Sequence, residues 1–230
     1  MELALTDGRI VSAPGLDFGD DSAAARAVVL THTQAGVRVA PLAGQADRWG
    51  RVAARIATAQ GDLAEALLAQ GLARYRPEAA AKPCRAGALA AESVARTAGV
   101  GLWATRPALA GADRAGLAAA PAGLTVVEGV VESVGEGPGR LYINFGPIRA
   151  VDFAVTISRR NLAILEAVGI DAKDLTGWRL RVRGLLDRRA GVTMEISDPD
   201  AIETLEPPAT RPPDLSAPQP EPPAPRPADP

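Results

Sequence analysis

Ala46-Asp47-Arg48-Trp49-Gly50-Arg51 is the stretch that decides the fold of this chain. It sets an acid, two cations, an aromatic residue and a glycine in one tight turn, and turns rich in Asp and Gly connect neighbouring strands. Val37–Leu42 alternates as a strand before this turn, and Val52–Ala59 is predicted as its partner strand. The sequence therefore predicts a β-hairpin with a charged, aromatic tip.

Three further motifs follow the hairpin in a fixed order. They are Gly61-Asp62-Leu63-Ala64-Glu65-Ala66-Leu67-Leu68-Ala69-Gln70-Gly71-Leu72-Ala73, then Glu92 with Ala95-Arg96, and finally Gly101-Leu102-Trp103. This order resembles the thermonuclease (staphylococcal-nuclease-like) family, with its D-[RK]-[YW]-G-R turn, its G-x-x-x-x-x-x-L-x-x-x-G-L-A helix and its closing A-R-x-x-x-x-G-L-W. The resemblance implies a small OB-type barrel with packed helices, and chemistry directed at phosphodiesters.

The resemblance also implies particular catalytic residues. In the family, two aspartates and a backbone carbonyl hold Ca²⁺, a glutamate activates water, and two arginines neutralise the phosphate, as suits a hard cation and a charge-gaining phosphoryl group. The arginine that ends the family's turn corresponds to Arg51, which is predicted as catalytic, although a solvated hairpin arginine is the simpler reading of that position. Trp49 takes the aromatic position, where it would stack on a nucleotide.

The other half of the family's pattern is damaged in this chain. The corresponding run is Asp7-Gly8-Arg9-Ile10-Val11-Ser12-Ala13-Pro14-Gly15-Leu16-Asp17-Phe18-Gly19-Asp20. Asp17 is predicted as a metal ligand, and Asp20 stands, one methylene shorter, where the family has its catalytic glutamate. Ser12 replaces an arginine, and the family's G-D-T aspartate falls upstream of Met1. We therefore expect no cofactor in this chain, or Ca²⁺ if the nuclease site is functional.

Local signals predict the remaining elements of the first half. Asp-Gly at 7–8 predicts a hairpin between 2–5 and 9–12, and apolar periodicity predicts three helices. The helices are expected from 22 to about 36, from 62 to 70 and from about 84 to 97.

The composition of the chain changes after residue 104. Residues 105–123 are rich in Ala, Gly and Pro and are predicted as a linker, with room for one helical turn. Residues 124–206 are predicted as a second small barrel, again OB-like, and resemble a C-terminal domain that accompanies thermonuclease domains in some bacterial proteins. Its strands are expected at 125–134, 140–145, 151–157, 178–186 and 192–196, with one helix at 159–168.

The tail from 207 to 230 holds 11 of the 20 prolines and no aromatic residue, and is predicted to be extended and mobile. A solvated tail is favoured over a docking site for a protein partner. The predicted fold class is thus mainly β with α: two OB-like barrels, the first (1–104) with packed helices, followed by this Pro-rich tail.

Arg179, Arg181 and Arg183 alternate with apolar residues in the second half. Side chains at i, i+2 and i+4 lie on one face of a strand, so three guanidinium groups share a face. Together with Trp49 they are predicted to bind nucleic acid, against the simpler reading of a charged outer strand face.

Composition limits the classes of function. The formal net charge is −2, and without the seven charged residues from 203 onward the chain has 23 basic and 22 acidic residues, so nucleic-acid contact would have to come from local patches. A single Cys84 and a single His32 exclude an intrachain disulfide and Cys/His zinc sites, and both are predicted to be inert. No apolar run approaches the ~20 residues that span a bilayer. The residues after Met1 have no long apolar stretch, so we expect no signal peptide in them, although the resemblance implies that family members are often exported.

Three functions remain open from the sequence. The first is a thermonuclease-family protein with an incomplete phosphodiesterase site, which acts as a binding module for nucleic acid or protein. The second is a Ca²⁺-dependent endonuclease whose missing ligand lies upstream of the given start. The third is a structural docking protein of the cell envelope.

Overall fold

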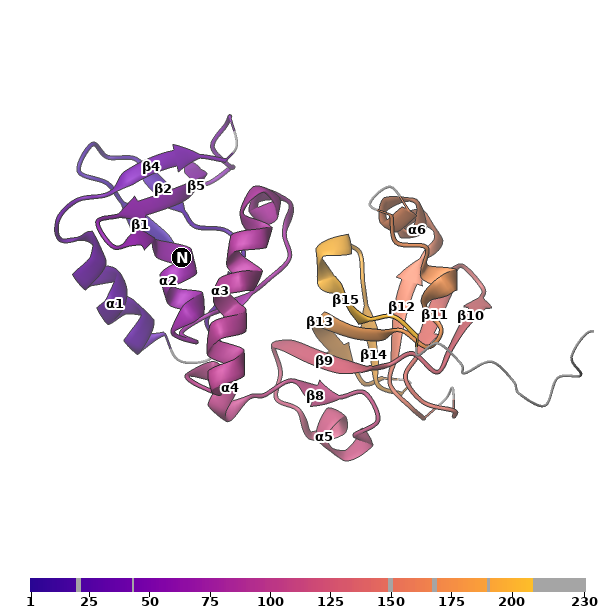
Figure 1. Cartoon of the computed structure of the whole chain (residues 1–230). Helices are drawn as coiled ribbons and strands as arrows, with labels where there is room; N and C mark the ends of the chain where they lie inside the picture. The colour runs from indigo at the N-terminus through magenta and orange to yellow at the C-terminus, as the bar shows by residue number, and fades with distance from the viewer. Residues whose placement is uncertain (20–21, 43, 149–150, 167–168, 190, 209–230) are drawn as a thin grey trace, which may run out of the picture.

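The computed structural model describes residues 1–19, 22–42, 44–148, 151–166, 169–189 and 191–208. Asp20 and residues 209–230 of the Pro-rich tail lie outside these ranges. Figure 1 shows two halves side by side, with α3 of the first half on the side that faces the second.

The first half is built on a sheet with strand order β1-β2-β5-β4, and β6 pairs with β5. Its strands are β1 (Glu2–Ala4), β2 (Ile10–Ser12), β4 (Arg38–Pro41), β5 (Arg51–Thr58) and β6 (Gly61–Asp62), while β3 (Leu16–Asp17) pairs separately with β7 (Arg74–Tyr75). Its helices are α1 (Ala23–Thr33), α2 (Leu63–Ala69), α3 (Arg85–Ala98) and α4 (Leu102–Thr105), with a short 3₁₀ helix η1 (Ala79–Cys84). The predicted hairpins and helices of this half are confirmed within a few residues.

Capping explains where α2 begins and ends. The Asp62 side chain accepts the N–H of Glu65, which satisfies one of the free donors of the first turn. Gly71 follows the helix with φ 67° and lies against Gly101, and an added Cβ at Gly71 would come within 2.4 Å of the Val100 carbonyl oxygen. The Leu102 N–H donates to the Gly71 carbonyl at 2.8 Å, so these motif glycines let two backbone segments touch.

The second half contains an eight-stranded sheet of order β10-β11-β12-β14-β13-β9-β8, with β15 paired to β13. Its strands are β8 (Leu109–Ala110), β9 (Leu124–Val130), β10 (Ser133–Gly137), β11 (Arg140–Asn144), β12 (Ala154–Ser158), β13 (Arg179–Asp187), β14 (Thr193–Glu195) and β15 (Ile202–Glu206). Its helices are α5 (Arg114–Ala119) and α6 (Arg159–Glu166), with 3₁₀ helices η2 (Ala172–Leu175) and η3 (Pro199–Ala201). Over the described residues neither large sheet closes, so the prediction of two OB-like barrels is not confirmed and the fold is mixed α/β.

Residues 105–123 differ from the predicted linker, because they contain β8 and α5. Strand β8 pairs in parallel with β9, and Leu117 of α5 is buried in the core of the second half. Gly111 packs against Phe145, where an added Cβ would lie 2.8 Å from the ring. Leu109, Leu117 and the close contact of Gly111 therefore hold this Ala-rich segment against the sheet. The boundaries of the two domains stay a prediction.

A buried ion network joins the two halves. Arg183 of β13 has a fully buried side chain and donates to Glu92 of α3 at 2.9 Å, to the Tyr75 carbonyl at 3.0 Å and to Glu203 of β15. The Glu92 carboxylate also accepts the Tyr75 N–H at 2.7 Å. Burial by itself would raise the pKa of Glu203, but the nearby Arg183 and Arg181 outweigh it and hold that pKa below its ordinary value. Every charged group in this contact is therefore compensated by a partner.

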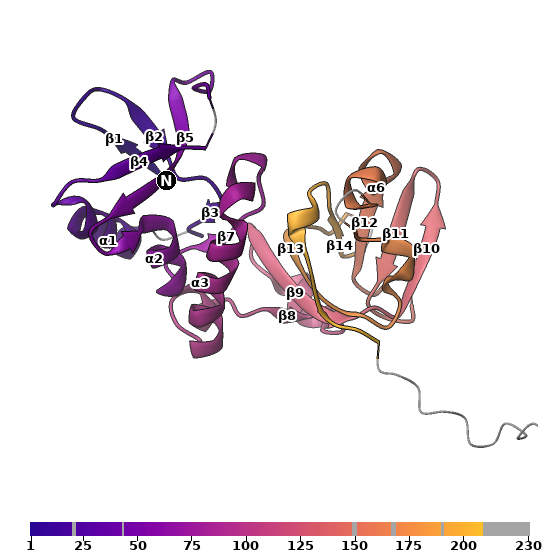
Figure 2. The ribbon, with the colours of Figure 1, turned by 45° about the horizontal axis from the view of Figure 1, so that its top comes forward.

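A second contact between the halves surrounds Trp103. This indole is buried with Ala95 of α3 and Val126 of β9, and the Arg74 guanidinium lies 4.7 Å from its ring centroid. Arg74 is itself buried and donates to the carbonyls of Leu102 and Arg106. Figures 1 and 2 both show α3 on the side of the first half that faces β9, and Figure 1 shows α4 leading into β8. The halves thus share an apolar contact as well as an ionic one.

Candidate functional site

The turn at residues 47–51 is organised by Asp47. Its Oδ1 accepts the N–H groups of Trp49 at 2.9 Å and Arg51 at 3.0 Å, and Gly50 turns the chain with φ 78°. Such side-chain to backbone bonds are what Asp supplies in turns. The predicted hairpin is therefore present, and its tip is exposed.

The Arg51 guanidinium is held by two carboxylates. Its Nη2 lies 2.7 Å from Asp47, and its Nη1 lies 2.5 Å from Glu2 of β1. The hydrogen bonds that Arg51 donates to Asp47 and Glu2 raise the pKa of Arg51, and the bond that Asp47 accepts lowers the pKa of Asp47. The charge of the arginine that was predicted to be catalytic is thus already compensated inside the protein.

Strand register shows what surrounds Arg51. Ile10 is opposite Arg51, while Ser12 of β2 is opposite both Glu2 and Ala53. Because paired residues and residues two apart share a sheet face, Glu2, Ser12 and Arg51 lie on the same face. The position expected to carry the family's other arginine lies on the same face as Arg51, but it holds a hydroxyl group opposite the carboxylate of Glu2.

Of the two acids predicted for the site, Asp17 lies in the described part of the chain and Asp20 does not. Asp17 lies in β3 opposite Arg74 of β7, and its Oδ1 accepts the Gly19 N–H at 3.1 Å. Asp20 lies outside the described residues. Within the described ranges no group of three or more His, Cys, Asp or Glu side chains could hold a metal ion. Of the predicted ligands, the described residues therefore include Asp17, whereas Ca²⁺ takes six to eight oxygen ligands.

Trp49 is exposed over 60% of its surface, as a stacking platform requires. The Arg48 guanidinium lies 3.9 Å from its ring centroid and that of Arg51 lies 4.6 Å away. Arg48 is exposed and has no ion pair among the residues that the structure covers. The turn therefore combines an exposed indole, which two guanidinium groups contact, with one cation that has no ion pair among the described residues.

The predicted basic stripe on β13 is corrected by the structure. Arg183 has no exposed side-chain surface, and Arg181 is 10% exposed and bonded to Glu128 at 2.7 Å and Glu203 at 3.1 Å. Only Arg179 is open to solvent, with Glu128 3.7 Å away. The arginines do share a face, but that face packs against α3, with Glu128 of β9 and Glu203 of β15 beside it in the same sheet, so it cannot follow a phosphate backbone.

Sequence reasoning missed the acids that meet these arginines. Glu92 lies four residues after Ala88 and three before Ala95, and all three are buried on one face of α3. This helical spacing was readable, because a glutamate on an otherwise small and apolar stripe requires a buried partner. Its partner Arg183 lies 91 residues away, and no local signal connects the two.

The remaining candidates are weak. Cys84 is a half-buried free thiol, and burial raises its pKa, so it is protonated at neutral pH. Its position agrees with the prediction of an inert thiol.

No helix in the described part of the chain is long and apolar enough to cross a membrane.

Comparison with known families agrees with the first half of the chain. Residues 9–105 match the family described as Staphylococcal nuclease homologue. No curated protein matches the chain. The match, together with the turn at residues 47–51, defines residues 9–105 as a staphylococcal-nuclease-like segment. The segment 9–105 belongs to the thermonuclease-like family.

Proposed function

We propose that this chain is a thermonuclease-family protein that binds its ligands without hydrolysing phosphodiesters. The observation that carries the proposal is the pairing of Arg51 with Glu2 and Asp47, next to a serine at the second arginine position. A phosphate entering this face meets one guanidinium whose charge is compensated, together with two carboxylates that repel it. A transition state that gains negative charge is stabilised by hydrogen-bond donors that are not already paired with other groups of the protein.

The nucleic-acid contact that remains is the tip of the hairpin. Trp49 offers an exposed ring and Arg48 an exposed cation, which is the combination that single strands use for stacking and phosphate contact. The chain has no net positive charge that would attract a polyanion from a distance. We therefore propose weak contact with single-stranded nucleic acid at this turn.

We expect the purified protein to show no measurable cleavage of single-stranded DNA or RNA in millimolar Ca²⁺. Each missing transition-state cation costs roughly 10²–10³ in rate. The assay follows release of a fluorophore from a quenched oligonucleotide, with Ser12→Arg as a second variant. Robust Ca²⁺-dependent cleavage that is lost in Arg51→Ala would overturn the proposal and favour the endonuclease.

Binding of a fluorescent oligothymidine is expected to be weak and to depend on the hairpin tip. Loss of one stacked base costs about 1–3 kcal/mol, so Trp49→Ala should weaken binding roughly fivefold or more. Each phosphate contact with a single strand adds about −0.7 to the slope of the logarithm of the binding constant against the logarithm of the salt concentration. Arg48→Ala should therefore make this slope less steep by about 0.7, the contribution of one contact. Fluorescence anisotropy at two salt concentrations measures both effects.

Arg189→Ala is the matched control for this titration, because its side chain is 90% exposed and lies in the second half. It should bind like the wild type. If Trp49→Ala and Arg189→Ala give the same curves, the hairpin tip is not the contact.

A further inference from the structure

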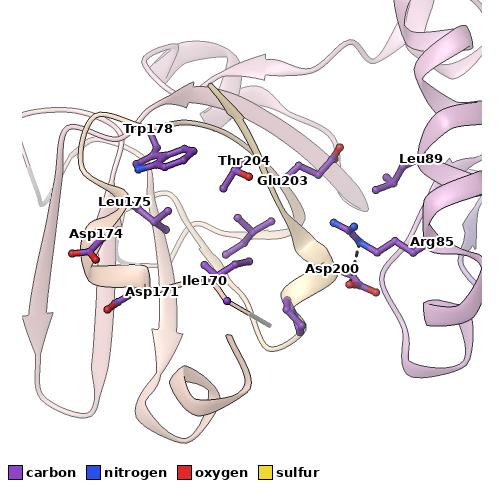
Figure 3. A pocket seen from close by; sticks show the side chains of 13 residues that line it. Arg85, Leu89, Ile170, Asp171, Asp174, Leu175, Trp178, Asp200, Glu203 and Thr204 are labelled. Atoms are coloured by element: carbon purple, nitrogen blue, oxygen red, sulfur yellow. Dashed lines mark ion pairs between the residues drawn. The ribbon is translucent and has the colours of Figure 1, made fainter. Parts of the chain in front are cut away.

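A cleft of about 690 Å³ opens between α3 and the second half. Figure 3 shows Arg85 and Leu89 of α3 on one side, Trp178 with the segment 170–175 on the other, and residues 200–204 between them. Its size falls in the range of ligand sites, and such sites are common between domains. None of the residues of the thermonuclease-like turn lines it.

One part of the cleft is apolar. Its surface includes Leu89, Ile170, Leu175, Trp178 and Ile202. Trp178 is half-buried, which leaves part of its ring available to a ligand. An indole is the aromatic side chain that attracts cations most strongly.

The charged lining is unbalanced. Asp200 is paired with Arg85 at 3.1 Å, and Glu203 is used by Arg181 and Arg183. Asp171 and Asp174 remain, both exposed and both without an ion pair among the residues described here. The neighbouring Lys173 is directed to Glu136, 3.0 Å away. On the side of Trp178, the cleft therefore presents two carboxylates without an ion pair, of which Asp171 also interacts electrostatically with Lys173.

The shape of the lining favours an extended ligand. Ile202, Glu203 and Thr204 belong to β15, which within the described ranges pairs only with β13 and so has one edge without a strand partner. Free strand edges pair with extended peptides. The labelled side chains in Figure 3 are spread along the cleft from Asp174 to Arg85 and do not converge on one point.

We propose that this cleft binds an extended basic peptide segment of a partner protein. A lysine or arginine of the peptide lies over Trp178 and faces Asp171 and Asp174, while its apolar residues contact Leu89 and Leu175. Nucleic acid does not fit, because its phosphates would meet these same carboxylates. The proposal goes beyond the function of the hairpin and does not depend on whether the thermonuclease-like site is active.

The test uses the full chain and a fluorescein-labelled nine-residue peptide of alternating Arg and Val. A second peptide, in which Glu replaces each Arg, has the same length and apolar content. We expect anisotropy to rise with the basic peptide and not with the acidic one. Binding should weaken with salt, because exposed charge pairs are screened.

The double variant Asp171→Asn, Asp174→Asn should weaken binding of the basic peptide at least fivefold. Asn keeps the cap that Asp171 provides for Lys173, so the variant is expected to fold. The control Glu132→Gln, Glu195→Gln removes the same charge from exposed positions outside the cleft and should leave binding unchanged. Trp178→Ala gives an independent reading of the aromatic contact, with circular dichroism as the check on folding.

Equal binding of the basic and acidic peptides would overturn the proposal, as would equal weakening by both double variants. Displacement of the basic peptide by oligothymidine from the wild type, but not from the Asp171→Asn, Asp174→Asn variant, would assign the cleft to nucleic acid and also overturn it. Nuclease activity of the protein would refute the proposed function and leave this result unchanged, so the two failures are distinguishable.

Discussion

Arg183→Met is expected to lower the free energy of unfolding by about 3–5 kcal/mol. Removing one partner of a buried ion pair leaves the other charge without compensation, which costs this amount in other proteins. Here the carboxylate left behind is Glu92, whose side chain is fully buried and whose other ion-pair partner in the described part of the chain, Arg96, lies 3.9 Å away. The Tyr75 carbonyl loses its donor as well.

Urea unfolding followed by circular dichroism measures this loss. Arg179→Met is the matched control, because it lies two residues away on the same strand but has a half-exposed side chain with Glu128 3.7 Å away. An exposed pair of this kind contributes about 0–1 kcal/mol. Similar effects of the two substitutions would show that the buried network does not hold the halves together.

Trp103→Ala should also destabilise the protein by about 3–5 kcal/mol, which is usual for a buried tryptophan. The substitution opens a cavity between α3 and β9, removes the ring that contacts Arg74, and leaves Val126 without its neighbour. Because this contact belongs to both halves, the protein should unfold in one transition in the wild type and more separately in the variant.

Trp49→Ala serves as the control here, since the two tryptophans have the same size but Trp49 is exposed. Exposed substitutions usually change stability by less than about 0.5 kcal/mol. The measurement is thermal unfolding followed by far-ultraviolet circular dichroism. A small loss in Trp103→Ala, or two transitions already in the wild type, would contradict a shared apolar contact.

Local signals predicted most of the elements of the first half. Asp62 as N-cap, Gly71 and Gly99 as helix ends and Asp47 in its turn each act through bonds to near neighbours in the chain. Such bonds depend on few residues, so their pattern is readable before the fold is known. The match to the thermonuclease-like family over 9–105 agrees with this reading.

The second half was predicted less completely. Strand β15 was not predicted, because Ile202–Glu206 is short, has two acids and leads into the prolines. It forms by pairing with β13, and its two acids meet Arg179 and Arg181 across the strands. A strand that is stabilised by its partner gives a weak signal in its own residues.

The candidate site, like the fold, was predicted only in part from the sequence. Residue identity alone shows that Ser12 cannot supply a cation and that Arg51 and Trp49 stand at the tip of a hairpin. Only the tertiary structure decided that Arg51 is paired with Glu2, that Arg181 and Arg183 are buried, and that a cleft with Asp171, Asp174 and Trp178 lies between the halves. The physical reason is separation along the chain: turns and caps are local, whereas the partner of a charge and the exposure of a strand face depend on residues tens of positions away.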